Sequence, residues 1–111
     1  GKAGGLDQLA EPLGLYYLEQ GDVNAAVRAF GDVKSNNAAV AQIMAKDYSK
    51  AQRTLDAVAN PDATTYYLKA IVAARTNDAA HVVSNLTRAK QLDPAVGNQA
   101  INDLEFARYN H

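Results

Sequence analysis

The side chains of this sequence that could act as bases, nucleophiles or metal ligands near neutral pH are few and far apart. There is no cysteine, and the two histidines are His81 and His111. Neither histidine is followed at i+3 or i+4 by a second histidine or a carboxylate, the spacing that would place two metal ligands on one helix face. Ser35, Ser49 and Ser84 lack the Gly-x-Ser-x-Gly surroundings of an activated serine. The sequence therefore predicts no catalytic residue, no cofactor and no metal site.

The charge balance argues against two further classes of partner. The chain has 11 Lys and Arg residues and 12 Asp and Glu residues, a formal net charge of −1. No sequence-wide field would therefore attract nucleic acid or an anionic membrane surface. No apolar run approaches the roughly 20 residues that a membrane-spanning helix needs. Residues Gly1 to Gly5 do not follow the phosphate-loop pattern, because no Ser or Thr follows Lys2. We expect these residues to form a flexible tail.

The elements that would position any binding residue are helices. Alanine is abundant, tryptophan is absent, and most glycines and prolines fall between segments with apolar residues at helical spacing. The clearest case is Leu13 to Phe30, where two helical patterns meet at a turn over residues 20 to 22. A small residue lies beside an aromatic residue in each pattern: Gly14 with Tyr17, and Ala26 with Phe30. Small residues let helix axes approach closely, so this stretch is predicted to be a helical hairpin.

The same hairpin resembles the tetratricopeptide repeat, a helical repeat with a period of 34 residues. The family signature has Leu-Gly, then Tyr, then Gly-Asp, then a small residue and Phe at this spacing. The residues that carry the resemblance are Leu13, Gly14, Tyr17, Gly21, Asp22, Ala26 and Phe30. The resemblance implies an all-α superhelix of stacked hairpins. It also places Tyr17 and Tyr48 at packing positions, which leaves Tyr67 as the better tyrosine for a binding site.

Weaker copies of the pattern follow along the chain. The stripe Tyr48, Ala51, Leu55 and Val58 repeats the spacing of Val23, Ala26, Phe30 and Val33, 25 residues later, so the second repeat is shorter than the family period. We expect three degenerate repeats, at 6–34, 35–59 and 60–93, and a capping helix at 94–111, in one domain of about seven helices. The capping helix would cover the last apolar surface with Val96, Ile101, Leu104 and Phe106. The first helix is expected to begin at or just before Pro12, after a lead-in with Leu6 and Leu9, because proline disrupts a helix interior.

Tetratricopeptide repeats are binding scaffolds, so the resemblance implies a non-catalytic interaction module for a protein or peptide partner. In the family, the first helix of each hairpin lines the inner, concave surface. Carried over residue by residue, that surface is a largely apolar groove of Leu15, Leu18, Glu19, Val40, Ile43, Met44, Tyr67, Leu68, Ile71 and Arg75.

A second interpretation, from a different class, stays open. The short second repeat makes the inner surface small, which favours a structural spacer or oligomerisation domain whose groove is filled by its own last helix. Shortened, irregular repeats also resemble those of bacterial cell-envelope proteins, which favours a periplasmic or outer-membrane-associated parent. Because the sequence opens on glycine and not on methionine, we expect it to be a piece of a longer protein.

Overall fold

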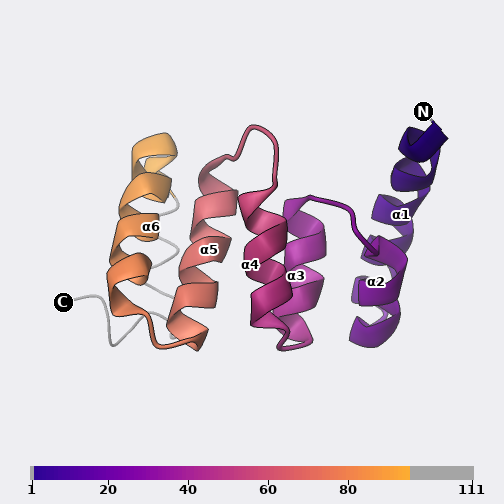
Figure 1. Cartoon of the computed structure of the whole chain (residues 1–111), viewed down its shortest axis with the longest axis horizontal. Helices are drawn as coiled ribbons and strands as arrows, with labels where there is room; N and C mark the ends of the chain where they lie inside the picture. Colours follow the sequence, from indigo (N-terminus) through magenta and orange to yellow (C-terminus); the bar gives the residue numbers. More distant parts are fainter. Residues whose placement is uncertain (1, 96–111) are drawn as a thin grey trace. The chain divides into compact units, whose positions relative to one another are not determined.

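A computed structural model describes residues 2–95 of the chain, with side chains from Leu9 onward. These residues form six α-helices and no strand (Figure 1), which confirms the predicted all-α class. The helices are α1 (Lys2–Glu19), α2 (Val23–Phe30), α3 (Asn36–Met44), α4 (Tyr48–Asp56), α5 (Ala63–Arg75) and α6 (Ala79–Leu92). The expected capping helix with Val96, Ile101, Leu104 and Phe106 lies outside the described residues. None of the helices described is long and apolar enough to cross a membrane.

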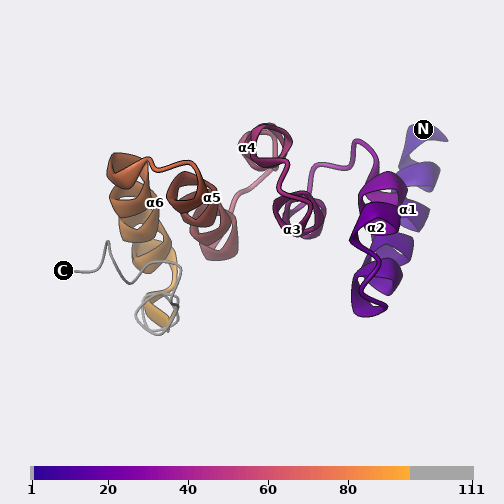
Figure 2. The same ribbon diagram turned by 90° about the horizontal axis from the view of Figure 1, so that it is seen from below.

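The chain divides into two compact units, Gly1–Ala57 and Val58–His111. In the first unit α1 packs against α2 and α3 packs against α4 (Figure 2). Helix α3 also contacts both α1 and α2. In the second unit α5 packs against α6 (Figure 1).

Each of the three hairpins turns in the same way. In each turn, the backbone N–H of an aspartate donates a hydrogen bond to the carbonyl five residues earlier. The residue before the aspartate donates its N–H to the carbonyl three residues before it. These two bonds together form the Schellman motif. The aspartate bonds are Asp22 to Tyr17 at 2.9 Å, Asp47 to Gln42 at 2.9 Å and Asp78 to Ala73 at 2.8 Å. The residues before the aspartates have positive φ: 80° at Gly21, 67° at Lys46 and 61° at Asn77.

The same aspartates begin the second helix of each hairpin. Each carboxylate accepts a hydrogen bond from the backbone N–H three residues later, at 3.1 Å for Asp22, 3.2 Å for Asp47 and 3.3 Å for Asp78. Such an N-cap satisfies one of the N–H groups that a helix start leaves unpaired. One aspartate therefore ends the turn and starts the next helix. This local chemistry explains why the turn over residues 20 to 22 could be predicted from the sequence.

The buried positions also repeat from hairpin to hairpin. The position four residues after each aspartate holds a fully buried small or branched side chain, and the position eight residues after it holds a large buried one. The three pairs are Ala26 and Phe30, Ala51 and Leu55, and Val82 and Leu86. The predicted stripes of α2 and α4 therefore point into the core as expected.

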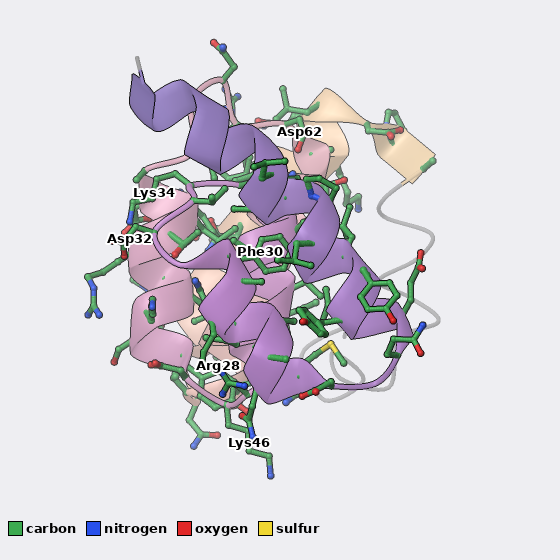
Figure 3. All side chains as sticks on the ribbon, turned by 90° about the vertical axis from the view of Figure 1, so that its right-hand side faces the viewer. Arg28, Phe30, Asp32, Lys34, Lys46 and Asp62 are labelled. Carbon is green, nitrogen blue, oxygen red and sulfur yellow. The ribbon has the colours of Figure 1, made fainter. Side chains whose placement is uncertain are left out.

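The core of the first unit forms where α1, α2 and α3 meet. Phe30 packs with Ala26 of α2 and with Ala38 and Ala41 of α3. Gly14 of α1 leaves space for the ring, because a Cβ there would lie only 2.5 Å from Phe30 Cε2 and Cζ. Figure 3 shows the Phe30 ring turned toward α1. The close approach predicted for the first hairpin is therefore confirmed at Gly14 and Phe30.

The start of α1 differs from the prediction. α1 is one helix from Lys2 to Glu19 with Pro12 inside it, so the expected start at Pro12 was wrong, and Lys2 to Gly5 are helical where we expected a flexible tail. Pro12 is exposed, so its ring does not disturb the core. The neighbouring residue, Glu11, is held by α3: its carboxylate accepts hydrogen bonds from Ser35 Oγ at 2.9 Å and Asn37 Nδ2 at 2.7 Å. We attribute the continuity of α1 to this tertiary contact, which opposes the local effect of proline.

Candidate functional site

The predicted groove residues of the first unit mostly face its interior. Leu15 and Leu18 pack against the cluster of Phe30 with Ala26, Ala38 and Ala41. On α3, Ile43 is buried and Val40 is half-buried, whereas Met44 is 52% exposed. Glu19, at the end of α1, is exposed. Of the predicted set in this unit, Glu19 and Met44 are the side chains that stand free in solvent.

The predicted groove residues of the second unit lie along α5 and are divided in the same way. Tyr67 and Ile71 are half-buried and pack against a cluster built by Ala70, Ala73, Ala74, Val82 and Leu86. Leu68 is buried and Arg75 is exposed. Packing between α5 and α6 thus takes up much of the apolar surface that the sequence assigned to binding. The role of these four α5 residues in a groove stays a prediction.

A different apolar surface stands open on α1. Leu9, Leu13 and Tyr16 are 69%, 47% and 53% exposed. They lie at i, i+4 and i+7, so they form one stripe along a single helix face. This stripe was not predicted, because Leu9 was expected in a lead-in and Leu13 in a packed hairpin. The spacing itself would have revealed it once α1 was known to continue through Pro12.

A shallow depression of about 250 Å³ adjoins this stripe, between α1 and α2. Its lining residues are Leu13, Tyr17, Ala25, Arg28 and Ala29. Leu13 belongs both to the stripe and to the depression, and the rings of Tyr16 and Tyr17 meet edge to face with centroids 5.4 Å apart. The stripe and the depression are therefore continuous. We call the seven residues together the outer face: Leu9, Leu13, Tyr16, Tyr17, Ala25, Arg28 and Ala29.

Arg28 is the single charged residue among those seven. It is exposed in the last turn of α2, and Figure 3 shows it on that helix, apart from Phe30. Its guanidinium makes no hydrogen bond or ion pair with any residue that the structure describes. Arg53 holds the same place in α4, 25 residues later, and is likewise exposed in the last turn of its helix. The outer face thus combines apolar side chains with one cation that has no counter-charge.

The second unit carries an aromatic and basic cluster on α5 and α6. The Tyr66 ring has Lys69 Nζ 5.1 Å from its centroid and the Arg88 guanidinium 5.8 Å from it, both within cation–π range. Lys69 also takes part in further interactions, and Arg88 donates a hydrogen bond to Gln91 at 3.3 Å. These contacts tie the two helices together at their surface.

A wider depression of about 430 Å³ lies where α5 begins and α6 ends, and it contains Asp62 and Asp93. Both carboxylates already accept backbone hydrogen bonds. Asp62 forms a capping box with Thr65, and Asp93 accepts from the Ala95 N–H at 3.0 Å. The Asp62 carboxylate therefore caps the start of α5, and the Asp93 carboxylate closes a turn onto the Ala95 N–H. Among the described residues, no three His, Asp or Glu side chains gather in a way that could hold a metal ion.

The one histidine that the structure describes also serves a helix start. His81 Nδ1 lies 2.5 Å from Asp78 Oδ2, and both side chains are exposed. The hydrogen bond from His81 is the main cause that holds the pKa of Asp78 below its ordinary value, and the His81 backbone N–H adds to it. His81 itself is exposed on α6. Its pairing with the carboxylate at i−3 was missed because only forward spacings were considered.

One buried polar side chain of the described residues, that of Gln42, makes no hydrogen bond. Its side chain is fully buried on α3, and neither its amide nitrogen nor its amide oxygen has a hydrogen-bond partner in the described part of the chain. It holds the place in its hairpin turn that Tyr17 and Ala73 hold in theirs. Because the side chain is sealed from solvent, it bears on stability and not on recognition.

Comparison with protein-family models, with curated proteins and with solved structures finds no significant match for this chain. Its function must therefore be argued from its own residues.

Proposed function

We propose that this chain is a non-catalytic protein-interaction module, built from helical hairpins of the tetratricopeptide type, that binds a segment of a partner protein. The family assignment is supported by the resemblance of Leu13 to Phe30 to the family signature. It is also supported by the turn and the buried positions that recur in three hairpins. A repeated hairpin that stacks on its neighbours is the building principle of such scaffolds.

The observation that carries the binding role is the apolar stripe on α1. The large apolar side chains of Leu9, Leu13 and Tyr16, about one helical turn apart along α1, are each about half exposed or more. Contiguous apolar surface of this kind is typical of a site where another protein docks. The nearly balanced charge favours a protein over nucleic acid as the partner. The predicted groove, with Met44 as its most exposed apolar member in the first unit, is proposed as a second contact surface.

The alternative is a structural spacer or oligomerisation domain of a larger protein. It is favoured by the packing of Leu15, Leu18, Tyr67 and Ile71 against their own cores. A groove whose apolar residues are already covered has little surface to offer a ligand. The two functions differ in one measurable property. The interaction module has a different protein bound at an exposed apolar position, whereas the spacer or oligomerisation domain does not.

Site-specific photo-crosslinking in the native host tests the proposal. A photoreactive amino acid replaces Tyr16 or Met44, and the exposed polar residue Ser49 serves as the control position. We expect a heterologous protein to be crosslinked at Tyr16 or Met44 and not at Ser49. Crosslinks only to other copies of the chain, or none at the two apolar positions, would reject the interaction module in favour of the spacer.

A further inference from the structure

We propose that the outer face binds an amphipathic α-helix of a partner protein, which places apolar side chains on Leu9, Leu13 and Tyr16 and a carboxylate beside Arg28. This inference rests on the proposed interaction function and specifies the chemistry of the partner. It concerns the side of the first hairpin that carries the stripe and the depression, and none of the predicted groove residues takes part in it.

The relief of the outer face suits a helix. Leu13 and Tyr17 lie one turn apart on α1, and Ala25 and Ala29 lie one turn apart on α2. The two pairs line a trough with large walls on one side and small residues on the other. Ridges of side chains on one helix pack into such grooves between the side chains of others. From Leu9 to Tyr16 the stripe is about 10 Å long at 1.5 Å per residue, which matches two turns of a bound helix.

The rest of the same hairpin shows what this kind of surface accepts. Ala26, on α2 next to Ala25, packs in one cluster with Ala38 and Ala41 of α3. Small residues there let a third helix approach the α1 and α2 pair closely. An extended peptide would bring unpaired backbone N–H and C=O groups onto apolar side chains, which is costly. A helix satisfies its own backbone, so it is the better occupant of the outer face.

The charge of the outer face selects an acidic partner. Docking would remove Arg28 from water, and a desolvated cation needs a hydrogen-bonded counter-charge. A carboxylate can accept two parallel hydrogen bonds from the guanidinium. A second copy of the chain, docked symmetrically through the same face, would bring no carboxylate from it, because Arg28 is its one charged member. Charge complementarity thus favours a helix with Asp or Glu near its apolar stripe.

Selection from a displayed library of helical peptides, with the full chain as bait, tests this inference. The probes are 18-residue peptides with a fixed alanine-rich helical frame and random residues on one face. We expect enrichment of leucine-like residues at i, i+3 or i+4, and i+7, together with Asp or Glu beside them. The enrichment should be lost with Leu13→Gln as bait.

Isothermal titration of the best peptide then examines the ion pair. Arg28→Glu should weaken binding about fivefold, the upper range for a partly exposed ion pair, and a peptide with Lys in place of its acidic residue should restore binding to that variant. Arg53→Glu is the matched control, since Arg53 has the same place in the next hairpin, and it should leave affinity unchanged. Circular dichroism of each variant verifies that the helices remain folded.

Several results would overturn the inference. Enriched peptides that are proline-rich or lack an acidic residue, or equal binding by Leu13→Gln, would show that the outer face does not bind an acidic helix. Self-association of the chain that Leu13→Gln abolishes would assign the face to a second copy. If peptides bind but depend on Met44 instead, the interaction function stands and this inference fails. If no peptide is enriched and no partner is crosslinked at Tyr16 or Met44, both fail.

Discussion

Replacing Gly14 by alanine tests the packing that holds the first hairpin together. An alanine Cβ at this position would lie 2.5 Å from Phe30 Cε2 and Cζ and 2.6 Å from Cδ2. Carbon atoms in contact settle at about 3.5 to 4.0 Å, so the ring or the helix would have to move by about 1 Å or more. Phe30 is only 1% exposed, so its ring cannot swing into solvent. The strain therefore stays in the core between α1 and α2.

The size of the effect follows from two opposing terms. Alanine is favoured over glycine in a helix interior by about 1 kcal/mol, whereas overpacking a closed core costs about 1 to 3 kcal/mol. Because the contact is short and the ring is confined, we place the cost near the upper end and expect a net destabilisation of about 2 kcal/mol. For a domain of this size, that corresponds to a fall in melting temperature of about 10 °C. Urea and thermal unfolding followed by circular dichroism at 222 nm measure both quantities.

A double-mutant cycle with Phe30→Leu isolates the contact. Leucine lacks Cε2 and Cζ, two of the three ring carbons that would meet the new Cβ, so Gly14→Ala should cost at least about 1 kcal/mol less in that background. Gly21→Ala is the control. A Cβ at Gly21 would meet no atom within 4 Å, but the φ of 80° there is strained for alanine, so the cost of about 1 kcal/mol should be the same in both backgrounds. An equal cost of Gly14→Ala with and without Phe30→Leu would refute the proposed close approach.

Three further predictions use the polar residues. Gln42→Met should raise the free energy of unfolding by about 1 to 2 kcal/mol in urea titrations, because it removes a buried amide without partners; a loss of stability would mean that this amide is hydrogen-bonded. Glu11→Gln should destabilise the first unit by about 1 kcal/mol, because the single amide oxygen of glutamine cannot take the places of both carboxylate oxygens that accept from Ser35 and Asn37. An unchanged unfolding midpoint would contradict the link to α3. The folded-state pKa of Asp78 is lowered, so its carboxylate contributes stability above the unfolded pKa of about 4, and this is lost as pH falls through the folded pKa. Asp78→Asn should therefore lower the melting temperature near pH 6 and have a smaller effect near pH 3, and an equal effect at both pH values would argue against it.

The candidate site shows where prediction from sequence stopped. Spacing alone identified Leu15 and Leu18 as apolar and helical, but it could not tell which neighbour covers them. In the structure they pack with Phe30 and the alanines of α3, while Leu9 and Tyr16 remain open. Which side of a helix is covered depends on how the hairpins pack, and such contacts join residues far apart in the chain. The tetratricopeptide assignment, the absence of catalysis and the groove stay predictions.

The sequence by itself determined the features that a few neighbouring residues control. The turns at Gly21, Lys46 and Asn77 and the caps at Asp22, Asp47 and Asp78 depend on hydrogen bonds that span no more than five residues. The apolar stripe of α2 followed from helical spacing in the same way.

Only the tertiary structure decided whether α1 would continue through Pro12. Local chemistry favours a helix start at proline, but Glu11 is bonded to Ser35 and Asn37, which lie 24 and 26 residues away. That continuity extends α1 back past Leu9 and creates the stripe of Leu9, Leu13 and Tyr16. The Leu9 end of the outer face therefore depends on the continuation of α1 through Pro12, and the contact made there by Glu11 joins residues that no window of sequence short enough to specify a helix contains.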